Sequence, residues 1–189
     1  MRRLAIVALS ALMCTSAFAA FGETEPNNTR ATADAVLYTR AAPWSDLGLI
    51  SLTANDSDFF KIRLRASDWL TVITFPVSQN NTRPDTVLAL FDATGTTALV
   101  WNDDAGTIGN LGSAIRYQAQ ADGDYFIAIT AFYSATGRDQ LSYYENANHT
   151  DVGDYILTVS VAPVPEPASI LALGAGLAGL AGLRRRMRK

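Results

Sequence analysis

The chain has 189 residues, with 15 basic and 18 acidic side chains, a formal net charge of −3 and one cysteine. Two of the basic residues precede residue 20 and five follow residue 183, whereas Glu166 is the only acidic residue beyond residue 163, so residues 20–163 carry a formal charge of −9. Such an acidic domain argues against nucleic acid and anionic membrane surfaces as partners, and it is compatible with divalent cations.

The first 19 residues have the three parts of a secretory signal peptide. Two arginines precede the apolar run Leu4–Met13, and Ala17-Phe18-Ala19 has the small-x-small pattern of a cleavage site. We expect a signal helix over residues 1–19 and cleavage between Ala19 and Ala20. Because Cys14 lies in this segment, the mature chain is predicted to contain no disulfide and no cysteine-ligated metal.

Residues 20–162 are predicted to form one all-β domain. Short β-rich runs alternate with turn clusters such as Asn55-Asp56-Ser57-Asp58 and Asp122-Gly123-Asp124. A sustained helical period is found only at the two ends of the chain. We therefore expect a single jelly-roll-like β-sandwich. Its expected strands are Leu47–Leu52, Phe59–Leu64, Trp69–Phe75, Thr86–Phe91, Ala98–Asn102, Ser113–Gln118, Asp124–Ala131 and Asp154–Val161.

A polar, aromatic-bearing insertion, Phe132–Asp151, separates the last two expected strands and is too long for a hairpin loop. Its residues Tyr133, Tyr143 and Tyr144 are candidates for stacking on sugar rings or gripping a peptide. The alternative is that the insertion packs over an open edge of the sandwich.

Three other conspicuous side chains have ordinary structural interpretations. Trp69 and Trp101 lie in strand patterns, so we expect both in the core. His149 is the only histidine and lies in a polar loop, where we expect a solvated side chain rather than a catalytic base.

The last residues, 163–189, form a separate tail. Val164-Pro165-Glu166-Pro167 leads into the apolar run Ala168–Leu183, and five of the six residues that follow are basic. A helix over this run is about 24 Å long, against a hydrocarbon core of about 30 Å, so we expect a short membrane-anchor helix. The basic end is predicted to face the cytoplasm.

This tail resembles the PEP-CTERM sorting signal of Gram-negative bacteria, with Pro165, Glu166 and Pro167 as the signature tripeptide. The resemblance implies export, transient anchoring in the inner membrane and processing by an exosortase-type membrane protease. It implies that the processed protein resides in the cell envelope or extracellular matrix, where exopolysaccharide is a candidate partner.

The middle of the chain resembles the bacterial pre-peptidase C-terminal domain, a β-sandwich appended to many secreted peptidases. The resemblance implies a PPC-like β-sandwich over residues 20–162, although here no peptidase precedes the module. The motifs that carry it, in the order of the family, are Glu25-Pro26-Asn27-Asn28-Thr29, Gly48-Leu49-Ile50, Asp56–Ile62, Asp85–Asp92, Asn102-Asp103-Asp104, Asp122–Ile129 and Gly153–Val159.

Calcium is the sharpest hypothesis for a site. Calcium binds six to eight oxygen atoms, and residues 23–28 supply four carboxylate or amide side chains, to which the acidic loop at residues 55–58 adds more. Collagen-binding members of the family hold calcium between an acidic N-terminal segment and an acidic loop. The resemblance therefore implies a structural calcium site, while capped turns in both segments are the alternative. The implied ligands are Glu23, Glu25, Asn27, Asn28, Asp56 and Asp58.

The sequence offers little for catalysis, because it contains no Gly-x-Ser-x-Gly elbow, no phosphate-binding glycine loop and no zinc-ligand spacing. We expect an exported, non-catalytic protein associated with the envelope or exopolysaccharide. A carbohydrate- or protein-binding lectin-like module is the first alternative, and a secreted hydrolase is the second.

Overall fold

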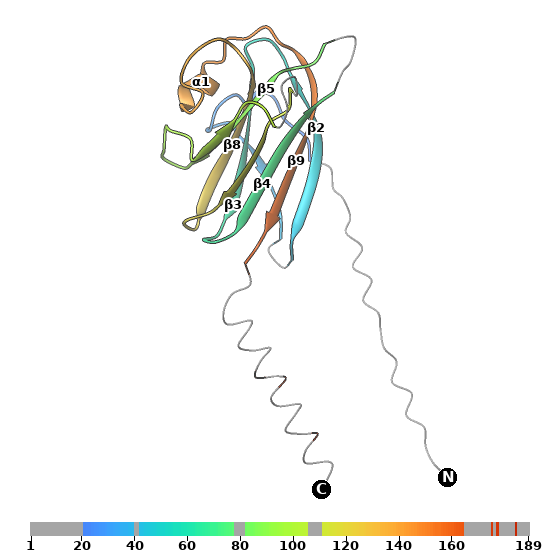
Figure 1. The fold of residues 1–189 in the computed structure, drawn as a ribbon, viewed down its shortest axis with the longest axis vertical. Helices are drawn as coiled ribbons and strands as arrows, with labels where there is room; N and C mark the ends of the chain where they lie inside the picture. The colour runs from blue at the N-terminus through green and yellow to red at the C-terminus, as the bar shows by residue number, and fades with distance from the viewer. Residues whose placement is uncertain are drawn as a thin grey trace, which may run out of the picture.

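The structure is a computed structural model that describes residues 21–39, 42–77, 82–105 and 111–164, together with the single residues 175, 177 and 184. Within these ranges the chain forms nine strands and one short helix (Figure 1). The elements are β1 (Asp34–Val36), β2 (Trp44–Leu52), β3 (Ser57–Leu64), β4 (Trp69–Pro76), β5 (Thr86–Asp92), β6 (Val100–Asn102), β7 (Ala114–Gln118), β8 (Gly123–Ala131), α1 (Leu141–Glu145) and β9 (Gly153–Ala162).

The strands form two sheets packed face to face. In the described part of the chain, the five-stranded sheet has the order β1-β3-β8-β5-β6 and the four-stranded sheet has the order β2-β9-β4-β7. Apart from β1, these are two layers of four strands wound as a jelly roll. The predicted all-β, jelly-roll-like sandwich is therefore confirmed.

All eight predicted strands are present, with ends that differ from the prediction by at most three residues. The sequence did not predict β1, which pairs in parallel with β3 and places Asp34 opposite Phe60. A strand of three residues is too short to show the alternation of apolar and polar residues on which the prediction depends.

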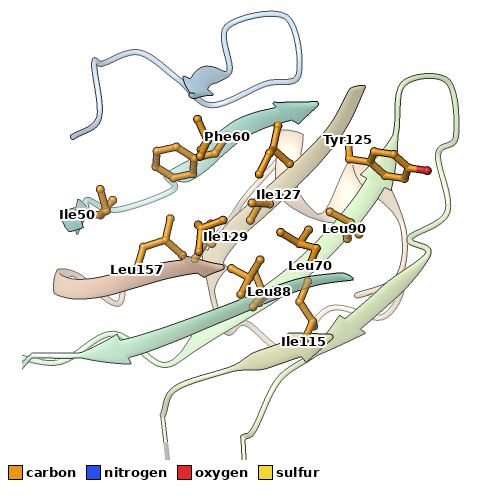
Figure 2. Packing of buried hydrophobic residues seen from close by; sticks show 14 of the residues in the cluster. Ile50, Phe60, Leu70, Leu88, Leu90, Ile115, Tyr125, Ile127, Ile129 and Leu157 are labelled. Carbon is orange, nitrogen blue, oxygen red and sulfur yellow. The ribbon is translucent and has the colours of Figure 1, made fainter. Parts of the chain in front are cut away.

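The main core lies between the two sheets (Figure 2). In β2, buried and exposed side chains alternate along the strand, because only one face of the four-stranded sheet points inward. Figure 2 shows Leu70 of this sheet clustered with Leu88 and Ile127 of the five-stranded sheet. Removal of this apolar surface from water stabilises the sandwich by about 25 cal/mol per Å² buried.

The five-stranded sheet is buried on both faces along β5 and β8, whereas Lys61 and Arg63 of β3 are exposed. Strand β5 is buried from Thr86 to Phe91 without alternation, and β8 from Tyr125 to Ala131. The outer faces of these strands pack against Leu141 and the tyrosines of α1 in a second apolar cluster, and α1 lies beyond this sheet in Figure 1. The polar insertion therefore packs on the sandwich, but it covers the outer face of this sheet and not an open edge, which is where the packing alternative places it.

The N-terminal segment enters the edge of the main core through Phe21. The Phe21 ring packs edge-on against the Phe60 ring, with centroids 5.7 Å apart. Gly48 of β2 makes room for this segment, because a Cβ atom at Gly48 would clash with the carbonyl oxygen of Phe21. The absence of a side chain at residue 48 thus fixes the path of the chain that leads to Glu23.

We predict that Gly48→Ala lowers the free energy of unfolding by about 1–3 kcal/mol, the usual cost of overpacking, because the new methyl group displaces the Phe21 backbone. Thermal and urea denaturation would measure the change. Gly123→Ala is the matched control, since a Cβ atom there meets no atom within 4 Å. Equal stability of the two variants would contradict the close approach of Phe21 to β2.

Candidate metal centre

The N-terminal segment is held beside the start of β3 by hydrogen bonds to two strands. The Ser51 amide donates to Glu23 Oε1 at 2.9 Å, and the Phe59 amide donates to the Asn27 carbonyl oxygen at 3.1 Å. The first bond ties the segment to β2 and the second to β3. Carboxylates that are distant in the sequence are thereby brought together.

Three carboxylates converge at this junction. Glu23, Glu25 and Asp58 each offer an oxygen atom, and these three atoms lie within 4.8 Å of one another. Asp58 is fully buried, Glu23 is half-buried and Glu25 is exposed. The site therefore has a dry side at β3 and an open side at Glu25.

Two asparagine side chains adjoin the carboxylates in a fixed orientation. Asn27 Nδ2 donates to Asp34 Oδ2 at 3.3 Å, and Asn28 Nδ2 donates to Asp56 Oδ1 at 2.8 Å. Each amide nitrogen thus faces a carboxylate, and the amide oxygen points the other way. Oxygens of this kind are ligands that calcium accepts.

Four oxygen atoms of this region are buried and have no hydrogen-bond partner among the described residues. They are Glu23 Oε2, Asn27 Oδ1, Asn28 Oδ1 and Asp58 Oδ1. A buried acceptor without a donor costs about 1–3 kcal/mol, and more when it is charged. A cation can satisfy several buried acceptors at once, so this set of carboxylate and amide oxygens fits calcium.

The electrostatics of the carboxylates agree with this interpretation. Burial, reinforced by the Glu23 carboxylate, raises the pKa of Asp58 well above its ordinary value, against the opposing effect of the hydroxyl that Tyr155 donates at 2.6 Å. Burial also raises the pKa values of Glu23 and Glu25, and neighbouring carboxylates raise them further. The folded chain thus disfavours three negative charges here unless a positive charge offsets them.

Asp56 lies beside the cluster, but its oxygens are already occupied. Its Oδ2 accepts hydrogen bonds from the amide and hydroxyl of Thr53, and its Oδ1 accepts from the Ser57 amide and from Asn28. These four bonds use the acceptor capacity of a carboxylate. Among the six residues proposed as ligands, Asp56 is therefore placed to orient Asn28 rather than to offer a free oxygen.

Asp34 is the residue of this site that the sequence analysis missed. Its Oδ2 accepts from the Thr24 amide at 2.7 Å as well as from Asn27. The only signal in the sequence is its acidity, because its proximity to Thr24 depends on the parallel pairing of β1 with β3.

The tyrosine hypothesis needs correction. The side chains of Tyr143 and Tyr144 are only 3% and 1% exposed. Tyr143 stacks on the half-buried Tyr133 with ring centroids 4.1 Å apart, and Tyr144 packs edge-on against Phe91 at 5.6 Å. With their rings packed inside the second apolar cluster, Tyr143 and Tyr144 have no open face for a ligand.

His149 is also not the solvated side chain that the sequence predicted. It is buried, and its Nε2 lies 2.8 Å from the Asp56 carbonyl oxygen while its Nδ1 lies 2.9 Å from the Asp151 carbonyl oxygen. The ring therefore ties the loop that follows α1 to the loop that carries Asp56.

The two tryptophans expected in the core are nearer the surface. Trp101 is 41% exposed on β6, at the edge of its sheet. Trp69 is half-buried, and the Arg116 guanidinium lies 4.3 Å above its ring. Both lie in strands, as predicted, but on sides that do not face the core.

The predicted signal cleavage at Ala19 and Ala20 and the Pro165-Glu166-Pro167 motif lie outside the described residues, so both remain predictions from the sequence. The same holds for most of the anchor run Ala168–Leu183. Among the residues that are described, none belongs to a helix with the length and apolar character needed to cross a bilayer.

Comparison with known families confirms both resemblances. Residues 56–131 match the family described as the bacterial pre-peptidase C-terminal domain, and residues 163–186 match the PEP-CTERM protein-sorting motif. The sorting motif implies an exported protein that is processed by an exosortase-type system. The domain match begins at Asp56, so the segment that contains Glu23 and Glu25 lies outside it. No curated protein sequence matches the chain.

Solved structures with a similar fold include proteins of two kinds. PliG of Aeromonas hydrophila, a periplasmic inhibitor of g-type lysozyme, has 16% identity and a TM-score of 0.45 over 68% of this chain and 95% of that one. The pre-peptidase C-terminal domain of a Bacillus anthracis collagenase has 12% identity and a TM-score of 0.40 over 68% and 93%. At these values neither similarity assigns a function to this chain.

We predict that Asp58→Asn stabilises the protein at pH 8 in the presence of a chelator, and that the gain shrinks toward pH 5. Below the ordinary value of 3.8, Asp58 is protonated in both states. As the pH rises above this value, the unfolded chain ionises first, and the folded state loses stability until the pH passes its own raised pKa. Asparagine keeps an acceptor for Tyr155 and removes this loss.

Melting temperatures of the two chains between pH 5 and 8 would measure the difference. Asp139→Asn, in the loop before α1, is the control for loss of one acidic residue. A constant difference between wild type and Asp58→Asn across this range would contradict the raised pKa.

Proposed function

We propose that this chain is an exported, non-catalytic β-sandwich protein of the cell envelope or secreted exopolysaccharide, with a structural calcium site at its N-terminal side. Two observations carry the calcium proposal: the cluster of three carboxylates, and four buried oxygen atoms of Glu23, Asn27, Asn28 and Asp58 that have no hydrogen-bond partner among the described residues. The match of the tail to a protein-sorting motif supports the proposed location.

The chemistry of the donor set favours calcium over transition metals. The side chains at the site are carboxylates and amides, without cysteine or histidine ligands. Hard oxygen donors select calcium or magnesium, and calcium tolerates irregular geometry with six to eight ligands. Glu23, Glu25 and Asp58 would supply the charge, and the oxygens of Asn27 and Asn28 would supply neutral ligands.

The proposed role of the ion is to hold the N-terminal segment on the sandwich. Glu23, Glu25, Asn27 and Asn28 belong to that segment, whereas Asp58 belongs to β3. An ion that joins them would link both parts of the chain in the folded state only. Its binding energy would therefore add to the stability of the fold.

A non-catalytic role is supported by the burial and hydrogen-bond geometry of His149, the only histidine of the sequence. The His149 ring is buried and both of its nitrogens lie against backbone carbonyl oxygens, so neither is placed to take a proton from a substrate. Residues 56–131 match a family that is described as a domain C-terminal to peptidases and not as a peptidase itself. A carbohydrate- or protein-binding module is the second candidate, because one face of the four-stranded sheet is open and apolar.

We expect millimolar calcium to raise the melting temperature of the full chain purified in detergent, and a chelator to reverse the effect. A ligand at one hundred times its dissociation constant stabilises the folded state by about 2.7 kcal/mol. The rise should be smaller at pH 5 than at pH 8, because protons compete with calcium for the carboxylates.

Asp58→Asn is the decisive comparison, because it removes a proposed ligand and also the repulsion that destabilises the metal-free chain. At pH 8 the variant should melt at a higher temperature than the calcium-free wild type and gain little from calcium. Asp139→Asn should respond to calcium as the wild type does. Equal melting temperatures of wild type with calcium and with chelator would overturn the proposed metal site.

We also expect the mature protein from its native cells to begin at Ala20 and to lack the basic end of the tail. Replacement of Pro165-Glu166-Pro167 by three alanines should leave an unprocessed chain in the membrane fraction, since the sorting protease would lack its recognition motif. Mass spectrometry of cell fractions would measure both. An intact Met1–Lys189 chain in the cytosol would contradict the proposed export.

A further inference from the structure

The outer face of the four-stranded sheet is an open apolar surface. The insertion before β9 covers the five-stranded sheet, whereas β2, β4 and β9 alternate between buried residues and residues that reach solvent. Leu49 and Phe75 on this face are 60% and 65% exposed, and Leu47 and Ile73 are exposed beside them. Contiguous exposed apolar surface on a sheet face is typical of a binding surface.

A groove of about 570 Å³ lies at one end of this face. This volume falls in the range of small-molecule sites, roughly 300–1,000 Å³. The strand register places Ser45, Ser160, Thr71 and Arg116 side by side in a row that crosses all four strands. Trp44 and Trp69 line the same groove.

Arg116 supplies the only charge among the residues that line the groove. Its guanidinium lies over the Trp69 ring at 4.3 Å, and it has no hydrogen bond or ion pair with any described residue. Stacking on an indole holds the guanidinium plane in place and leaves its edge free to donate two parallel hydrogen bonds to a carboxylate. The groove is therefore a local positive site on a domain whose formal charge is −9.

The other polar groups of the groove are hydroxyls. Ser45 Oγ lies 2.8 Å from Ser160 Oγ at the surface, and Thr71 separates this pair from Arg116 in the register. Hydroxyls both donate and accept, and the indole of Trp69 offers an apolar surface with a polar edge. Together these groups complement a ligand that has an apolar ring face, hydroxyls along its edge and one carboxylate.

We propose that this groove binds a sugar unit of an acidic polysaccharide, with the uronate carboxylate on Arg116 and the sugar ring beside Trp69. The proposal rests on the proposed location in the envelope or exopolysaccharide, and it names the ligand class. The acidic residues elsewhere on the domain do not forbid it, because charges more than about 8 Å apart are largely screened at physiological salt.

A second copy of the chain is a less suitable occupant. Two domains of formal charge −9 repel each other, and a face-to-face dimer that paired this row with its own copy would bury Arg116 against serine, threonine and arginine. Burial of an unpaired charge is costly. Dimerisation is therefore an outcome that the experiment must be able to detect.

The test is calorimetric titration of the full chain in detergent with a trimer of galacturonic acid, which is too short to gel with calcium, and with a neutral galactose trimer. Arg116→Gln should weaken binding of the acidic trimer by at least about tenfold, because it removes the charge-assisted hydrogen bonds to the carboxylate. Trp69→Ala should weaken it as well. The neutral trimer should bind far more weakly to every variant.

Matched controls separate the groove from the basic tail, which all variants retain. Lys61→Gln removes one positive charge from the outer face of β3, and Trp101→Ala removes an exposed indole on the other sheet. Both should bind the acidic trimer as the wild type does. Arg116→Lys keeps the charge but loses the planar fork, so its affinity should fall between wild type and Arg116→Gln, and melting curves would show that each variant is folded.

Equal affinity of Arg116→Gln, Lys61→Gln and wild type for the acidic trimer would overturn the proposal, as would equal binding of the neutral trimer. If sedimentation shows a dimer that is lost in the Phe75→Ser variant, the occupant of this face is a second copy of the chain and not a sugar. The proposed location fails separately, if the protein is absent from the envelope and matrix fractions of its native cells. Presence there without trimer binding would refute only the sugar site.

Discussion

Desolvation of the Asp58 carboxylate is the constraint around which the N-terminal side of this protein is built. Strand β3 must begin at the core for Phe60 and Ile62 to meet the facing sheet, and this position buries Asp58 as well. The hydroxyl of Tyr155 satisfies one oxygen of the carboxylate. The other oxygen is buried without a hydrogen-bond partner among the described residues, and the proposed calcium ion would compensate a charge that water cannot solvate.

The same constraint explains the hydrogen bonds that orient the asparagine side chains of the segment before β1. Asp34 and Asp56 each take the amide nitrogen of an asparagine, which leaves two amide oxygens buried without a donor. Buried acceptors are usually hydrogen-bonded, and the proposed calcium ion would be the partner of these two oxygens. Phe21 determines where this segment starts. Its ring packs against Phe60, and its backbone fits beside β2 because Gly48 has no side chain.

The sequence predicted the strands well because apolar alternation and turn residues are local signals, as in Phe60, Ile62 and Leu64. It could not predict the fate of Tyr143 or His149, because burial of a polar-looking loop depends on the sheet beneath it. The acidic cluster was predicted from composition and resemblance. The sequence could not predict that Asp58 has a free oxygen whereas Asp56 has none. This difference depends on the hydrogen bonds that Asp56 accepts, including one from Asn28 in a distant segment.

The carboxylate cluster and the groove on the four-stranded sheet lie near opposite ends of β2. Ser51, near its end, binds Glu23 of the carboxylate cluster, and Ser45, near its start, lines the groove. Six residues of strand separate them by about 20 Å. Ala162 also lines the groove, and Pro165 of the sorting motif follows within about 10 Å of chain. The groove and the sorting motif are therefore close along the chain, whereas the carboxylate cluster lies toward the other end of β2.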